Sequence, residues 1–255
     1  MIFDALEFDF TPPPQVKWAR RILIKPCAMH PLPHPITTSR ETLEAVILGI
    51  RKVSEADIIL LEGNPRQESM RPIYQAVGYD FPRVITLDVK DSVLVEVENP
   101  LTRPFALPTF WLPNVLLTCD YLISIAPLKI FAKQGSFSIK NLLGLLPVNR
   151  YKGEAEYGWS ALYELGIERV VADLYFTLPF DLGIVDARKK FLGATDDPIK
   201  GEVEDYGKIF IGEPYEVDCE ASRAVGLVTE YLQLIEIGKA QLANKQSFHE
   251  RISHI

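Results

Sequence analysis

The stretch 118–147 contains the residues whose types and spacing best suit chemistry. An apolar strand expected at 121–125 leads to Lys129, and a short apolar segment further on carries Lys140 and Asn141. Two amines and an amide suit the binding of a carboxylate or a phosphate. They do not supply a nucleophile, a base and an orienting group, so this stretch favours binding over acid–base catalysis.

The segment 133–136, with the sequence KQGS, is expected to lead into a helix. Ser136 and free backbone N–H groups would then lie at the helix N-terminus, where the helix dipole favours anions. Ser136 and Lys140 are also spaced to share one helix face. The alternative is that Ser136 only caps the helix and Lys140 is a solvated lysine. The segment lacks the glycine and lysine order of a nucleotide-binding loop, so it predicts no ATP site.

Five expected strands end in a charged residue, and these residues are Lys25, Glu62, Asp88, Lys129 and Asp186. In open parallel sheets, ligands bind beyond the carboxyl ends of the strands. A polar cleft of mixed charge at this edge would suit an anionic small molecule, with or without a divalent metal. The alternative is that charges collect there because the strands reach water.

These positions assign candidate roles. The candidate ligand-binding residues are Lys25, Lys129, Ser136, Lys140 and Asn141. The candidate metal ligands are Glu62, Asp88 and Asp186, and the candidate acid–base groups are Lys129, Lys140 and Asp186.

Other reactive residue types have weaker patterns. His30 and His34 lie in a proline-rich loop, where their spacing does not indicate a metal site. Cys27 follows an expected strand and suits either a thiolate near a cation or inert packing. Asp218 suits the first turn of a helix or a further place in the cleft.

The composition is that of an ordinary globular chain. Its 255 residues are 47% hydrophobic and 24% charged, which fits one α/β domain over 1–255 or two packed lobes with a boundary near 99–115. The net charge of −7 and the lack of a basic run argue against general nucleic-acid binding. We expect a cytoplasmic protein without a membrane span, because no signal peptide and no apolar run of ~18 residues can be recognised. The sequence is compatible with an oligomer.

Strand patterns recur along the chain, at 21–26, 57–63, 84–88, 93–97, 121–125, 181–186 and 208–211. A helix expected at 39–54, with a capping box that starts at Thr38, joins the first two strands and makes them parallel. Further helices are expected at 69–77, 158–177 and 216–243, and a charged surface loop at 188–206. The predicted fold is α/β, with a mixed, mainly parallel sheet and helices on both faces.

The order of several short motifs resembles the uncharacterised family called domain of unknown function 362, over about residues 20 to 230. The motifs are Ile24-Lys25-Pro26, Leu61-Glu62-Gly63, Pro127-Leu128-Lys129, Lys140-Asn141-Leu142-Leu143-Gly144 and Ile184-Val185-Asp186. The resemblance implies an α/β fold. It also implies a common pocket around Lys25, Lys129, Lys140, Asn141 and Asp186.

The chain departs from this family in two of the motifs. Lys129-Ile130-Phe131 stands where the family usually has lysine, threonine and histidine, and Cys27 stands where an asparagine usually follows lysine and proline. Loss of the histidine argues against shared acid–base chemistry. Some relatives carry a ferredoxin-like cysteine module, but Cys27, Cys119 and Cys219 cannot supply the four ligands of an iron–sulfur cluster.

The sequence therefore predicts a cleft at the strand ends that binds an anionic small molecule, and it assigns no reaction. The alternative is a non-catalytic binding or assembly protein. In that case the aromatic, proline-rich segment 99–113 would be an interface, with Phe105, Phe110 and Trp111 exposed. Otherwise this segment is expected to cover the body of the protein.

Overall fold

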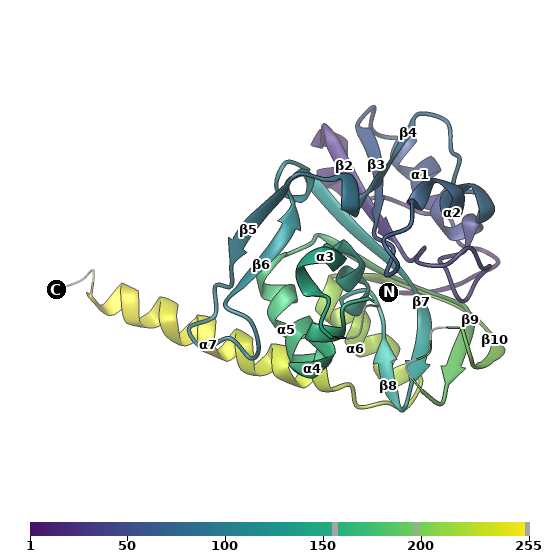
Figure 1. The fold of residues 1–255 in the computed structure, drawn as a ribbon. Helices are drawn as coiled ribbons and strands as arrows, with labels where there is room; N and C mark the ends of the chain where they lie inside the picture. Colours follow the sequence, from purple (N-terminus) through teal and green to yellow (C-terminus); the bar gives the residue numbers. More distant parts are fainter. Residues whose placement is uncertain (155–157, 196, 198, 253–255) are drawn as a thin grey trace.

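A mixed sheet forms the centre of the molecule (Figure 1). The computed structural model describes residues 1–154, 158–195, 197 and 199–252. Within these residues the sheet has eight strands, in the order β1-β10-β9-β7-β2-β3-β4, with β8 paired to β7. The strands are β1 (Ile2–Asp4), β2 (Arg21–Pro26), β3 (Asp57–Glu62), β4 (Val84–Asp88), β7 (Tyr121–Phe131), β8 (Gln134–Ser136), β9 (Leu182–Gly193) and β10 (Glu202–Gly212).

The adjacent strands β9, β7, β2, β3 and β4 are parallel to one another, whereas β10 is antiparallel to both β9 and β1. Strand β8 is antiparallel to β7. The mixed, mainly parallel sheet predicted from the sequence is confirmed. Two further strands, β5 (Leu94–Glu98) and β6 (Thr109–Pro113), form a separate antiparallel pair.

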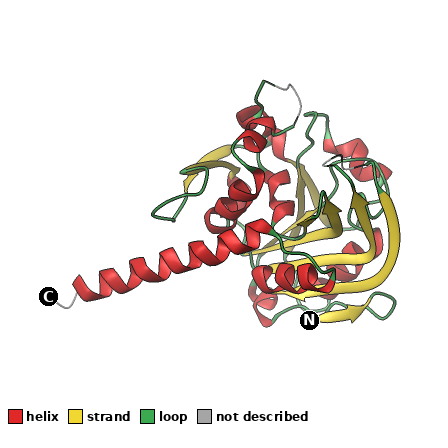
Figure 2. Ribbon diagram, turned by 90° about the horizontal axis from the view of Figure 1, so that it is seen from below, coloured by secondary structure: helices red, strands yellow, loops and turns green. Residues whose placement is uncertain are grey.

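Helices cover both faces of the sheet, as predicted (Figures 1 and 2). The helices are α1 (Arg40–Arg51), α2 (Met70–Ala76), α3 (Val148–Tyr151), α4 (Ser160–Glu164), α5 (Ile167–Thr177), α6 (Pro214–Ala224) and α7 (Glu230–Ile252). Short 3₁₀ helices are η1 (Pro14–Trp18), η2 (Val89–Asp91), η3 (Asn114–Leu117) and η4 (Lys140–Leu145). Buried residues of α1 and α2 pack on one face, and those of η4 and α4 to α7 pack on the other. The C-terminal part of α7 runs away from the body (Figure 2).

Burial on both faces explains why the central strands are continuously apolar. Alternate residues of a strand point to opposite faces. On β2, Ile22 and Ile24 therefore belong to the core under α1, whereas Leu23 belongs to the core under η4. The next residue on the η4 side is Lys25, so the strand sequence itself directs this lysine into the second core.

The hairpin of β9 and β10 replaces the surface loop predicted at 188–206. The prediction was wrong because the charges in this region suggested a solvated loop. Lys190 and Glu204 are register partners on the two strands, and their side chains form an ion pair at 2.7 Å. Phe191, the next residue, is buried. The charges therefore pair across an extended hairpin.

Strand β7 continues past its predicted end at residue 125, to Phe131, and turns into β8. A register shift between Pro127 and Leu128 accommodates the proline, which has no N–H to donate. The turn consists of Ala132 and Lys133, both with positive φ (47° and 69°). The predicted entry into a helix at 133–136 is therefore wrong, and Ser136 lies on a strand.

Two predicted helices are each divided. The expected helix 158–177 is α4 followed by α5, separated at Gly166, whose φ is 87°. The expected helix 216–243 is α6 followed by α7, with Gly226 (φ 68°) between them. Helix α1 begins at Arg40, one residue later than predicted. Its N-terminal cap is Ser39 and not Thr38, since the Ser39 side chain accepts from the Thr42 N–H.

The segment between β5 and β6 covers the body, because Asp173 on α5 holds its backbone. The Asp173 carboxylate accepts hydrogen bonds from the N–H groups of Phe105 (3.0 Å), Ala106 (2.6 Å) and Leu107 (2.9 Å). Phe110 is fully buried. Phe105 and Trp111 are half-buried, so the exposed aromatic patch expected for an assembly role is not formed.

Of the helices that the structure describes, none combines the length and the apolar character that a membrane crossing requires.

Replacing Asp173 with Asn should destabilise the fold. The amide has one acceptor oxygen, so at least one partly buried N–H of the covering segment loses its partner, at a cost of about 1–3 kcal/mol in the free energy of unfolding. Urea unfolding of Asp173→Asn against wild type measures this cost, with the exposed Asp80→Asn as the control. Equal unfolding midpoints for all three proteins would contradict this role of Asp173.

Candidate functional site

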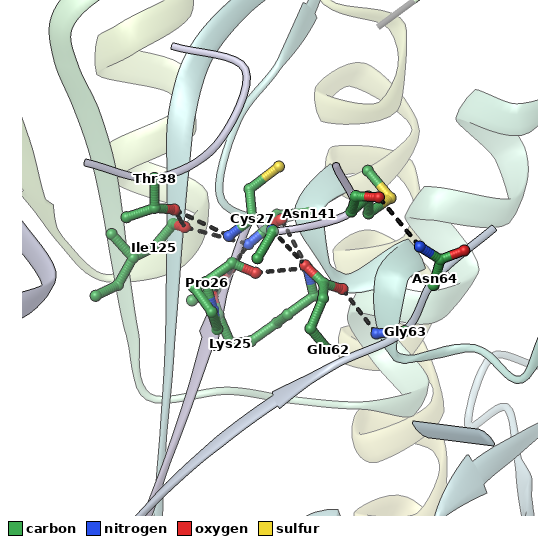
Figure 3. Close-up of polar contacts among 12 residues, drawn as sticks. Lys25, Pro26, Cys27, Thr38, Glu62, Gly63, Asn64, Ile125 and Asn141 are labelled. Atoms are coloured by element: carbon green, nitrogen blue, oxygen red, sulfur yellow. Dashed lines mark hydrogen bonds and ion pairs between the residues drawn. The ribbon is translucent and has the colours of Figure 1, made fainter. Parts of the chain in front are cut away.

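Lys25 is buried at the end of β2, and all three N–H bonds of its ammonium group have acceptors (Figure 3). Its Nζ donates to Glu62 Oε2 (2.9 Å), Asn141 Oδ1 (2.8 Å) and the Pro26 carbonyl oxygen (2.9 Å). Because each N–H bond of the ammonium group has an acceptor, the charge of Lys25 can be buried at this position. The lysine is therefore part of the framework of the site.

Glu62 ends the neighbouring strand β3, which places it beside Lys25. Its Oε2 also accepts from the Ala28 N–H (2.8 Å), and its Oε1 accepts from the Gly63 N–H (3.0 Å). Burial raises the pKa of the Glu62 carboxyl, while the Lys25 ammonium and the two N–H groups oppose that rise. Glu62 has no exposed surface.

Asn141 on η4 joins this ion pair to strand β7. Its Nδ2 donates to the Lys25 carbonyl oxygen and to Ser124 Oγ, both at 3.1 Å. Ser124 Oγ in turn donates to the Ser138 carbonyl oxygen at 2.7 Å. One amide thereby fixes η4 against β2 and β7.

Gly144 is the position at which η4 passes closest to the ion pair. A Cβ at Gly144 would lie 2.2 Å from Glu62 Oε1 and 2.8 Å from Lys25 Nζ. The spacing of Asn141 and Gly144 in the sequence thus lets one side chain bind Lys25 while the backbone passes over Glu62. We call Lys25, Glu62, Asn141 and Gly144 the buried ion-pair cluster.

A pocket of about 420 Å³ lies beside this cluster. Four of the five ligand-binding residues predicted from the sequence line it, namely Lys129, Ser136, Lys140 and Asn141. The fifth, Lys25, lies behind Asn141. Much of the remaining wall is apolar, with Met29, Phe131, Leu143 and Trp159 among its residues.

The two lysines that line the pocket have different partners. Lys140 forms an ion pair with Glu168 at the start of α5. Lys129 is buried, and its Nζ donates to the Ile36 carbonyl oxygen and lies 3.6 Å from Cys27 Sγ. Among the described residues, no carboxylate oxygen lies within 4.0 Å of Lys129 Nζ. The charge of Lys129 therefore has no carboxylate partner in the described part of the chain.

Ser136 reaches the pocket by a different route from the one predicted. It is the register partner of Lys129 across the β7–β8 hairpin. Neighbouring strands place such partners side by side. Sequence reasoning paired Ser136 with Lys140 on a helix, whereas the hairpin pairs it with Lys129.

The structure does not bring Glu62, Asp88 and Asp186 together as metal ligands, and none of them lines the pocket. Asp88 accepts from the Met70 N–H at 2.9 Å, at the start of α2. Asp186 accepts from the Ser39 N–H at 3.0 Å, at the start of α1. The described residues contain no group of three or more His, Cys, Asp or Glu that could hold a metal ion.

His34 and Asp218 hold backbone segments in place. His34 Nδ1 lies 3.2 Å from the Thr37 carbonyl oxygen, and its Nε2 accepts from the Lys189 N–H at 3.1 Å, which fixes the tautomer with the proton on Nδ1. Asp218, in the middle of α6, accepts from Ser138 and Ile139 just before η4. Burial raises the pKa of Asp218 to about 6. Asp218 is therefore neither a first-turn carboxylate nor a member of the pocket.

Cys27 and His30 line the pocket, whereas Cys119 and Cys219 do not. Burial is the main cause that lowers the pKa of His30, and Lys129 lowers it further. Sequence reasoning missed Glu168, which lies within a predicted helix. The local pattern contains no sign of its partner Lys140, because the two residues meet only through the packing of α5 on η4.

Comparison with known proteins finds a family and a related fold. The model of the family described as Domain of unknown function (DUF362) matches residues 22–223. The lactate racemase apoprotein from Thermoanaerobacterium thermosaccharolyticum is a solved structure of similar fold, with a TM-score of 0.55 and 15% identity. The match covers 87% of this chain and 53% of that one, so this chain spans about half the length of that structure. At this identity the likeness shows the α/β fold alone. No curated protein matches the sequence.

Gly144→Ala should destabilise the protein strongly, because its new methyl group would overlap the Lys25–Glu62 pair. Overpacking of this kind costs about 1–3 kcal/mol or more. Urea unfolding measures the change. Gly212→Ala is the control, because a Cβ there meets only Val217 Cγ2 at 3.2 Å. If the two variants unfold at the same urea concentration, Gly144 is not needed to accommodate the pair.

Lowering the pH should weaken the protein through His34. Burial lowers the pKa of His34 below 6.5, although Asp186 opposes this shift. Between the folded pKa and about 6.5 the unfolded chain binds the proton and the folded chain does not, so stability falls as the pH decreases through that window. The stability advantage of wild type over His34→Gln should therefore shrink from about pH 7.5 to about pH 5.5. Urea unfolding at both pH values tests this, and a constant difference would contradict it.

Proposed function

The chain belongs to the family described as Domain of unknown function (DUF362), as its motifs predicted, and we propose that its pocket binds a small carboxylate with an apolar body. The observation that carries the proposal is the buried ammonium group of Lys129. It lines the pocket, and its charge has no carboxylate partner among the described residues.

The cations around the pocket differ in how their charges are balanced. Lys25 is paired with Glu62, and Lys140 is paired with Glu168. A buried charge without a counter-ion is costly, because burial removes it from water. An anionic ligand would supply the counter-ion that Lys129 lacks, and the binding energy would include relief of that cost.

Several features favour a carboxylate over a phosphate or a nucleotide. One cation without a carboxylate partner matches one negative charge, and no arginine is among the described residues that line the pocket. The volume of about 420 Å³ lies within the range of small-molecule pockets. The wall that contains Leu143 and Trp159 offers apolar contact to the body of the ligand.

The other predicted residues support this role from different positions. Ser136 is the register partner of Lys129 across the hairpin, and it also lines the pocket. Asn141 uses both its amide oxygen and its amide nitrogen to bind Lys25, and it also lines the pocket. The acid–base roles suggested for Lys129, Lys140 and Asp186 stay predictions, and the proposal concerns binding.

Small carboxylates should raise the melting temperature more than their neutral amides do. A suitable set pairs acetate, hexanoate and phenylacetate with the corresponding amides. Lys129→Met should remove the carboxylate effect, because a charge-assisted hydrogen bond contributes about 1.5–3 kcal/mol. That energy corresponds to a loss in affinity of about tenfold or more.

Lys133→Met is the matched control, since Lys133 lies exposed in the turn of the same hairpin. Thermal unfolding followed by circular dichroism measures the shifts at fixed ionic strength. The proposal fails if no carboxylate exceeds its amide, or if Lys129→Met retains the full shift.

A further inference from the structure

We propose that Cys27 is a nucleophile of the pocket, and that its substrates are carboxylates that carry an electrophilic carbon. This inference rests on the proposed binding of a carboxylate at Lys129. Neither the family match nor the related fold assigns a role to this thiol. Three features carry it, namely the position of Cys27, the rigidity of its backbone and the cation beside its sulfur.

Cys27 directly follows β2, at the edge of the sheet where the pocket opens. The Cys27 sulfur points away from the Lys25–Glu62 pair in Figure 3, and the residue lines the pocket. The thiol thus points away from Lys25 and Glu62, although Cys27 lies two residues from Lys25 in the chain. A ligand bound at Lys129 would meet it directly.

The backbone of Cys27 is held at both its polar atoms. Its N–H donates to Thr38 Oγ1 at 2.9 Å, and its carbonyl oxygen accepts from the Thr38 N–H at 2.9 Å. Thr38 Oγ1 donates in turn to the Ile125 carbonyl oxygen at 2.6 Å on β7. Rigid placement of a nucleophile lowers the entropic cost of reaching a reactive geometry.

Lys129 Nζ lies 3.6 Å from Cys27 Sγ. The thiolate is the nucleophilic form of cysteine, and a neighbouring ammonium group favours it. In the thiol form, Cys27 donates to the Ile36 carbonyl oxygen at 3.7 Å. The same carbonyl oxygen also accepts a hydrogen bond from Lys129 Nζ. The same ammonium group would therefore lie beside both the reacting sulfur and the carboxylate of the substrate.

The other two cysteines have different surroundings. Cys119 donates to the Leu116 carbonyl oxygen at 3.2 Å, and burial raises the pKa of its thiol to about 11. Burial also raises the pKa of the Cys219 thiol. Neither lines this pocket, so both serve as internal references.

Alkylation with iodoacetate and with iodoacetamide tests the inference, because the two reagents differ in charge at nearly equal size. In each reaction the sulfur pair forms the S–C bond, the C–I bond breaks, iodide leaves with its electron pair, and the thiol proton passes to solvent. Rates at each cysteine are read by peptide mass spectrometry. In the folded protein, the iodoacetate-to-iodoacetamide rate ratio at Cys27 should exceed that at Cys119 and Cys219 by about tenfold or more, given the nearby charge. In urea-unfolded protein the three ratios should converge.

Lys129→Met should reduce the ratio at Cys27 by about tenfold, and Lys129→Arg should retain most of it. Lys133→Met is the charge-matched control, and circular dichroism confirms that each variant is folded. If Cys27 reacts with neither reagent while carboxylates still bind, this inference is overturned and the proposed function stands. If Cys27 reacts without preference for iodoacetate and Lys129→Met changes nothing, Lys129 does not select anions and both proposals are overturned.

Discussion

The buried ion pair of Lys25 and Glu62 is the constraint on which the rest of the site depends. Removing two charges from water is costly, and the cost is offset only if every donor and acceptor has a partner. Asn141, the Pro26 carbonyl oxygen and the N–H groups of Ala28 and Gly63 complete the set. Loss of either charged partner would leave the other buried and unpaired, so the ends of β2 and β3 and the path of η4 are fixed together.

The pocket follows from that arrangement. Once Asn141 fixes η4, the same short helix presents Lys140 and Leu143 to the pocket. The opposite wall is the β7–β8 hairpin, which carries Lys129 and Ser136 side by side. The two walls come from one continuous stretch of chain, yet the ends of β2 and β3 hold them in place. The framework is charged and fully paired, whereas the pocket wall keeps a cation without a carboxylate partner among the described residues.

The sequence predicted the sheet, because apolar strand runs are local patterns. Four of the five residues that it assigned to ligand binding line one pocket, and their role in binding stays a prediction. The sequence did not predict the β7–β8 hairpin, since the turn of this hairpin has Ala132 and Lys133 at positive φ, where glycine and asparagine are the usual residues. It also missed the pairing of Lys140 with Glu168, which only tertiary packing creates. Gly144 belongs to a motif that the sequence shows, but the physical reason for a glycine there, its close approach to Glu62, is visible only in the three-dimensional structure.

The two positions at which the chain departs from the family pattern lie in the same pocket. Phe131, in place of the usual histidine, and Cys27, in place of the usual asparagine, both line the pocket that contains Lys129. One departure exchanges a titratable ring for an apolar one, and the other exchanges an amide for a thiol. The framework residues Lys25, Glu62 and Asn141 retain the pattern. Both departures from that resemblance therefore lie in the pocket wall, and both accord with the proposed binding of a ligand that has an apolar body.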